Sequence, residues 1–150
     1  MSHEVDKLFA INASQDLRLW KLDFSDLTWA ERVFRTVWGL KGEVDNGGFD
    51  QFYFNSSGDT AFFAPEALDA IGAKEAAKVV SKANAFFPSP HPATDRGQRV
   101  KQLDALDEAA KRQFGSLENL FYQSPDDLHH LLFAFVQSHL SEIRGARSCG

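Results

Sequence analysis

Residues 43–59 read Glu-Val-Asp-Asn-Gly-Gly-Phe-Asp-Gln-Phe-Tyr-Phe-Asn-Ser-Ser-Gly-Asp, a run that interleaves acidic and aromatic side chains and holds no base. Gly47 and Gly48 follow an apolar stripe at helical spacing, and glycine tolerates the backbone angles at which helices end. Phe49, Phe52 and Tyr53 then recur at i, i+3 and i+4. This spacing predicts a short second helix, although residues 52–54 alone also suit a strand. The run therefore predicts a helix–turn–helix corner whose aromatic side chains fill the core.

Helical signals continue on both sides of this corner. Thr28 and Glu31 form a capping box at the start of the preceding helix, because each side chain can bond a free backbone N–H there. Residues 55–59 are a loop by composition. Further helices are predicted over residues 66–71, 74–87, 95–114 and 124–143.

These elements predict an all-α fold. Residues 1–150 are expected to form a single compact helical domain of about six or seven helices. Residues 1–24 are the least defined part of this prediction, an N-terminal extension that can hold a short helix packed on the body. Residues 145–150 are expected to be a frayed tail.

Composition limits the classes of function. The formal net charge is −5, and Lys and Arg form no cluster ahead of the tail. Because phosphate contacts supply most of the affinity for nucleic acid, direct DNA or RNA binding is disfavoured and a basic partner is favoured. No apolar run has the length of a membrane span, and the polar, acidic start is unlike a signal peptide. A single cysteine, Cys149, cannot form an intrachain disulfide, so the sequence predicts a cytoplasmic protein.

The sequence contains no motif that is typical of a metal or cofactor site. His129, His130 and His139 fall on the predicted last helix, but the nine-residue step from His130 to His139 spans about 13 Å along a helix, too far for one ion. The sequence holds no His-Glu-x-x-His pattern and no cysteine cluster. We therefore expect no metal and no cofactor.

Catalysis is an alternative that the sequence leaves open. No serine lies in a nucleophile elbow, and Cys149 lies in the predicted tail. A carboxylate pair, Asp45 with Asp50 or Asp50 with Asp59, can act as acid and base if the fold buries the two together. This alternative is an enzyme that acts on a small polar substrate in a cleft around Asp50. The expectation favoured here is a protein without enzymatic activity.

The run Asn46–Asp59, preceded by Trp38 and Glu43, resembles the signature of the bacterial DNA-mimic-protein family. Similarity continues through residues 67–73, and the resemblance covers roughly residues 25–140. It implies an all-α fold and a homodimer. It also implies that surface carboxylates imitate DNA phosphates and occupy the DNA-binding face of a transcription factor.

This resemblance turns the sequence into expectations about particular residues. A mimic gathers carboxylates on one face, where they meet the basic side chains of its partner. The expected partner-binding acidic face consists of Glu43, Asp45, Asp50, Asp59, Asp126 and Asp127. The expected structural signature consists of Asn46, Gly47, Gly48, Phe49, Gln51, Phe52, Asn55 and Gly58. A general interaction or immunity-type module that uses an acidic face without imitating DNA is a further alternative.

Overall fold

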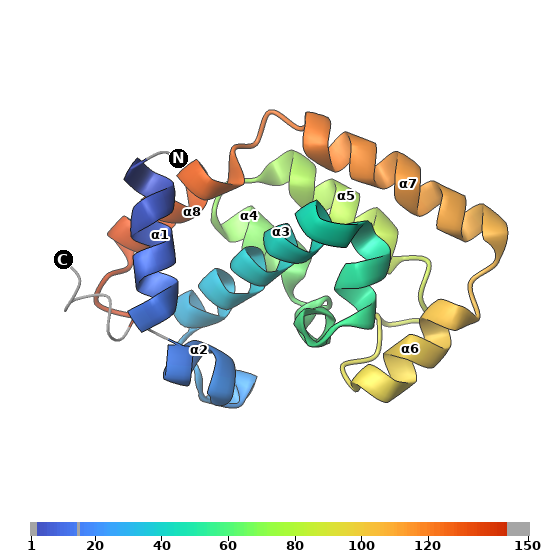
Figure 1. Ribbon diagram of the computed structural model, residues 1–150, viewed down its shortest axis with the longest axis horizontal. Helices are drawn as coiled ribbons and strands as arrows, with labels where there is room; N and C mark the ends of the chain where they lie inside the picture. Colours follow the sequence, from blue (N-terminus) through green and yellow to red (C-terminus); the bar gives the residue numbers. More distant parts are fainter. Residues whose placement is uncertain (1–2, 15, 144–150) are drawn as a thin grey trace.

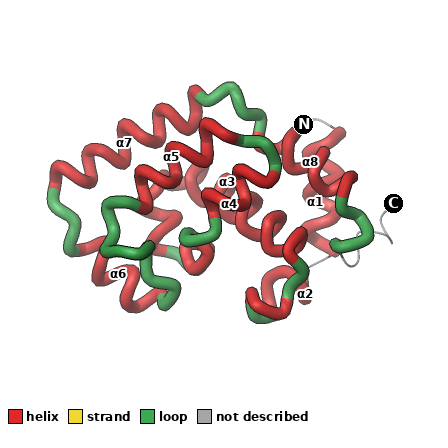
Figure 2. The backbone as a smooth tube through the Cα atoms, turned by 180° about the vertical axis from the view of Figure 1, so that it is seen from behind, coloured by secondary structure: helices red, strands yellow, loops and turns green. Residues whose placement is uncertain are grey.

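A computed structural model describes residues 3–14 and 16–143, and the fold in these residues is all-α (Figure 1). Figure 2 shows the same chain from behind as helices joined by loops, with no strand in its described part. The elements are α1 (His3–Ser14), α2 (Asp16–Lys21), the 3-10 helix η1 (Phe24–Asp26), α3 (Trp29–Phe54), the 3-10 helix η2 (Ser56–Thr60), α4 (Ala64–Ala70), α5 (Lys74–Asn84), α6 (Arg96–Asp104), α7 (Glu108–Gln123) and α8 (Leu128–Ser138).

The central element is α3, a helix of 26 residues against which most other helices pack. It begins at the predicted capping box: the Thr28 hydroxyl accepts from the Glu31 backbone N–H at 3.1 Å, and the Glu31 carboxylate accepts from the Thr28 N–H at 2.9 Å. The Thr28 hydroxyl also donates to the Glu142 carbonyl at 2.6 Å. This bond joins the start of α3 to the segment that follows α8.

The core on one side of α3 is aromatic. Tyr53 is fully buried and packs on Phe87 and Phe114, with ring centroids 4.5 and 5.6 Å apart. Phe49 contacts Phe121 of α7 at 6.0 Å. Figure 1 shows α7 running alongside α5, above the end of α3, so these rings hold the second half of α3 beneath the α5–α7 pair. Phe49, Phe52 and Tyr53 therefore face inward, as their spacing predicts, whereas Phe54 is exposed and the prediction that it fills the core is wrong.

The N-terminal helices cover the other end of α3. α1 packs on α8, where His130 approaches the Glu4 carboxylate at 3.0 Å, and Phe9 meets Trp38 edge to face at 4.9 Å. α2 carries Trp20, whose indole N–H donates to Asn12 at 2.8 Å. The residues described between 3 and 21 are therefore helical and are attached to the body.

The all-α prediction is confirmed, and the predicted stop between two helices at residues 45–48 is a kink inside α3. The described residues hold eight α-helices rather than six or seven, partly because the predicted helix 95–114 is two helices. It breaks before Asp107, whose carboxylate caps α7 by accepting from the Ala110 N–H at 2.8 Å. The last helix begins at Leu128, not near residue 124. The predicted frayed tail, residues 145–150 with Cys149, lies outside the described residues. None of the helices described is long and apolar enough to cross a membrane.

Candidate functional site

The glycine pair bends α3 at a point where a carboxylate from α7 binds the backbone. Gly47 (φ −155°, ψ 15°) and Gly48 (φ 77°, ψ −172°) leave the helical conformation. A Cβ on Gly48 would collide with the Glu118 carboxylate. Glu118 instead accepts the N–H of Phe49 at 2.7 Å, which caps the second limb of α3 and places negative charge at its positive end. Sequence reasoning missed Glu118, which lies 69 residues from its partner and carries no motif.

Glu43 connects the two limbs of the kinked helix. Its carboxylate accepts from the Gln51 amide at 2.7 Å and from the Asn55 amide at 3.0 Å. The bonds span eight and twelve residues, from the first limb to the second limb and its end. Glu43 therefore stabilises the bend through hydrogen bonds in which a carboxylate is the acceptor, and such bonds are stronger than neutral ones.

Residues 55–59 wrap around a buried arginine of α6. Arg99 has an exposed fraction of 0%, and its Nη2 lies 2.9 Å from Asp59 Oδ1. Its guanidinium donates to four carbonyl oxygens: Tyr53 (2.7 Å), Asn55 (2.8 Å), Ala93 (3.1 Å) and Thr94 (3.2 Å). A Cβ on Gly58 would lie 2.5 Å from the Phe52 carbonyl oxygen, so only glycine lets the turn approach this closely. Sequence reasoning missed Arg99 as well.

Asp45 and Asp50 are the exposed carboxylates beside the kink. Asp45 forms an ion pair with Lys41 at 2.7 Å, one helical turn away. The Tyr122 hydroxyl donates to the Val44 carbonyl at 2.6 Å. Desolvation, and then the charges of Asp45 and Glu118, raise the pKa of Tyr122. Carboxylates from α3 and α7 therefore produce a shared negative potential here.

The two acidic residues near α8 cap helices. Asp126 accepts from the N–H groups of Glu75 and Ala76, both at 3.0 Å, and so caps α5 rather than its own helix. Asp127 caps α8 by accepting the N–H of His130 at 3.1 Å. Burial and then Lys41 lower the pKa of His129, whereas the charges of Asp127 and Asp45 oppose this shift. Asp127 and Asp45 therefore both act electrostatically on His129.

Of the six acidic residues expected on one face, Asp45, Asp50 and Asp127 are exposed, although Asp45 is paired with Lys41 and Asp127 caps α8. Glu43, Asp59 and Asp126 are half-buried, and their carboxylates also bind partners within the chain. The signature residues Asn46 and Gln51 lie on the two limbs, Asn46 exposed and Gln51 half-buried.

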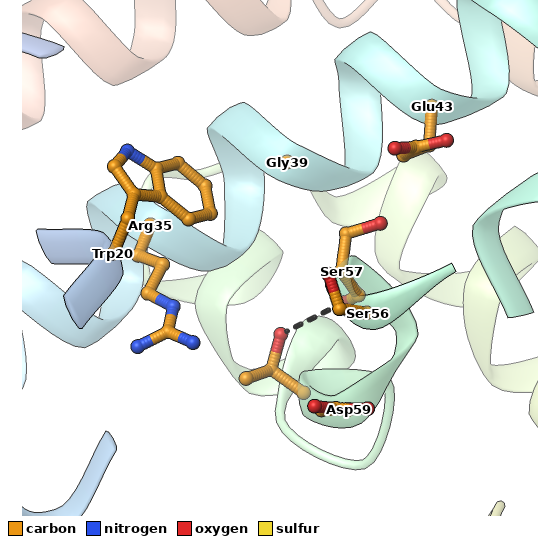
Figure 3. A pocket seen from close by; sticks show the side chains of 8 residues that line it. Trp20, Arg35, Gly39, Glu43, Ser56, Ser57 and Asp59 are labelled. Atoms are coloured by element: carbon orange, nitrogen blue, oxygen red, sulfur yellow. Dashed lines mark hydrogen bonds between the residues drawn. The ribbon is translucent and has the colours of Figure 1, made fainter. Parts of the chain in front are cut away.

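A polar pocket of about 460 Å³ opens between α2, α3 and η2 (Figure 3). Its lining consists of Trp20, Arg35, Gly39, Glu43, Ser56, Ser57, Asp59 and Thr60. Asp50 does not line this pocket, so the carboxylate pairs proposed around Asp50 do not meet in it. Within the described ranges, no group of three or more His, Cys, Asp or Glu side chains is arranged to hold a metal ion.

A family model described as DMP19-like protein matches residues 25–139. The chain belongs to the DMP19-like family. This is a DNA-mimic protein family, so the predicted family membership is confirmed. No curated protein and no solved structure matches the chain.

The segment matched to the DMP19-like family contains the kink of α3, the turn at residues 55–59 around Arg99 and the aspartates that cap α5, α7 and α8. It does not contain α1 or α2. Trp20 therefore reaches the pocket from outside the matched residues. In this stretch Glu43 and Asp59 bind partners within the chain, and Asp45 and Asp50 are the exposed carboxylates.

Proposed function

We propose that this protein is a non-enzymatic, acidic protein-binding domain that mimics DNA and occludes the DNA-binding face of a transcription factor or another basic protein. The observation that carries the proposal is the family match over residues 25–139. A homodimer, which the family resemblance implies, and a cytoplasmic location, which the single cysteine favours, belong to the same proposal. Neither a cofactor nor direct contact with nucleic acid is part of it.

The negative surface that best suits this role is the corner at the kink, formed by Asp45, Asp50, Glu118 and Asp127, and named here the acidic corner. Asp45 and Glu118 both raise the pKa of Tyr122, and Asp45 and Asp127 both act on His129. Lys41, the base at this corner, is already paired with Asp45. The arrangement supports attraction of a basic surface, because complementary charge steers association and selects partners.

Rigidity is the second support for the proposal. The backbone that carries Asp45 and Asp50 is held by Glu43 on one side of the kink and by Glu118 on the other. A surface whose groups are fixed before binding loses little conformational entropy on association. Glu43 and Glu118, through their hydrogen bonds within the chain, thus hold Asp45 and Asp50 in place.

The test is capture of DNA-binding proteins from a native lysate, followed by competition with duplex DNA. We expect the tagged wild-type chain to retain a DNA-binding protein that salt releases, because salt screens exposed charges, and that duplex DNA displaces. The variant Asp45→Lys with Asp50→Lys should lose this protein. Asp104→Lys, which reverses the charge of an exposed acid at the end of α6, is the control and should retain it.

Two results would overturn the proposal. One is a captured protein that duplex DNA does not displace, which favours a general interaction module. The other is equal capture by the wild type and the Asp45→Lys, Asp50→Lys variant. Both variants replace exposed side chains, and loss of the Asp45–Lys41 pair costs at most about 1 kcal/mol. Thermal unfolding close to that of the wild type therefore serves as the folding control.

A further inference from the structure

The pocket between α2, α3 and η2 has the size of a small-molecule site. Its volume of about 460 Å³ lies within the range of ligand cavities, roughly 300–1,000 Å³. In Figure 3, Trp20 and Arg35 lie on one side, Ser56, Ser57 and Asp59 on the opposite side, and Glu43 at the far end. The lining thus combines a flat aromatic ring with hydroxyl and charged groups.

The charged groups around this pocket already have partners within the chain. Asp59 is paired with Arg99, and Glu43 accepts two amide hydrogen bonds. Arg35 donates to the Leu22 carbonyl at 3.3 Å, and its guanidinium lies 5.5 Å from the centre of the Trp20 ring. The positive charges of Arg35 and Arg99 balance the negative charges of Glu43 and Asp59. An ionic ligand would therefore have to displace an existing contact.

One polar group at the pocket has no such partner. The Ser57 hydroxyl oxygen is buried and makes no hydrogen bond with any described residue. A buried hydroxyl without a hydrogen-bond partner is unfavourable, and a ligand that bonds to it removes this cost. The Trp20 ring, whose N–H is engaged by Asn12, presents its six-membered ring toward Gly39 and the pocket.

We propose that this pocket binds a neutral, hydroxyl-rich small molecule with one apolar face, of the size of a monosaccharide. The apolar face lies against Trp20, and the hydroxyl groups bond to Ser57 and to the free lone pairs of the Glu43 carboxylate. This site is separate from the acidic corner, and it does not depend on the protein-binding proposal. It includes α2, which the family match does not cover.

Two glycines of α3 allow a matched test. A Cβ on Gly39 would lie 3.4 Å from Ser57 Cβ and 3.5 Å from Trp20 Cη2, which are ordinary contacts, so Gly39→Ala narrows the pocket without a clash. A Cβ on Gly42 would meet nothing within 4 Å. Both substitutions place alanine in the same helix and raise its helix propensity alike. They differ in the methyl group that Gly39→Ala adds to the pocket.

The experiment is a titration of the full chain with D-glucose and D-ribose, followed by two-dimensional NMR of backbone amides and indole N–H groups. We expect saturable shifts at Trp20, Gly39 and Ser57 in the wild type with at least one of these sugars. Gly42→Ala should bind like the wild type. Gly39→Ala should bind at least about tenfold more weakly, the lower end of the roughly 10–200-fold by which one extra methylene discriminates in a hydrophobic pocket.

Charged probes complete the test. L-arginine and sodium acetate are titrated in the same way. The proposal is overturned if neither sugar shifts the Trp20 indole, if a charged probe shifts it and the sugars do not, or if Gly39→Ala and Gly42→Ala bind the sugar equally.

Discussion

Replacement of Arg99 by methionine should destabilise this protein more than any other single loss of charge. Arg99 is fully buried and donates to four carbonyl oxygens at 2.7–3.2 Å while it pairs with Asp59. Methionine fills a similar volume but leaves these acceptors in the interior without donors. A hydrogen bond from a charged donor contributes about 1.5–3 kcal/mol, and the cost of burying the guanidinium offsets part of this gain. Removal of one partner from a buried pair costs about 3–5 kcal/mol, and we expect a loss in this range.

The measurement is urea unfolding followed by tryptophan fluorescence. Domains of this kind have a free energy of unfolding of about 5–15 kcal/mol, so a loss of about 3–5 kcal/mol moves the midpoint far outside experimental scatter. Arg99→Lys keeps the charge but has fewer N–H groups in a different geometry, and should fall between the wild type and Arg99→Met.

Arg96→Met is the control, because it is the same substitution on the same helix. Arg96 is exposed, donates to the Phe54 carbonyl at 2.8 Å and lies 4.6 Å from the centre of the Phe54 ring. We expect it to cost at most about 1 kcal/mol. If Arg99→Met costs no more than Arg96→Met, the guanidinium does not hold the turn at residues 55–59 and the reasoning is refuted.

Two further outcomes follow from the kink and from α8. Gly48→Ala should lower the free energy of unfolding in urea by about 1–3 kcal/mol, because only glycine readily adopts φ 77° with ψ −172° and the new Cβ meets Glu118. An unchanged unfolding midpoint would contradict this prediction. Glu4 raises the pKa of His130 above its ordinary 6.5, whereas burial lowers that of His129 below 6.5. The His130 contact therefore adds stability at acidic pH and loses it as pH rises through the folded pKa, and protonation of His129 costs stability as pH falls below 6.5. NMR titration should find the two values on opposite sides of 6.5, and Glu4→Gln should return only His130 to its ordinary value.

The features that the sequence predicted are local ones. They are the capping box at Thr28, the break at the glycine pair and the burial of Phe49, Phe52 and Tyr53. Each depends on residues within one or two helical turns. Periodicity and capping chemistry report on contacts of this range. The sequence did not predict the helix boundaries at residues 105–107 and 124–127. At these two points the caps of the next helices are Asp107 and Asp127.

The features that the sequence could not predict are pairings between distant segments. Asp50 and Asp59 belong to one stretch and are the same residue type, yet Asp50 is exposed and Asp59 is paired with an arginine of α6. Asp126 has the position of a first-turn acid, yet it caps α5. A periodic pattern shows which face of a helix is buried, but not which side chain of another helix meets it.

Because α1 packs on α8, the segment that matches the family and the segment that forms the buried core have different boundaries. The family model matches residues 25–139. Leu8, Ile11 and Leu19 precede this segment and Ile143 follows it, yet all four side chains are buried. A chain trimmed to the shared segment would present newly uncovered apolar surface to water, and so would tend to self-associate. The segment that matches the family is therefore shorter than the segment needed to keep the apolar core covered.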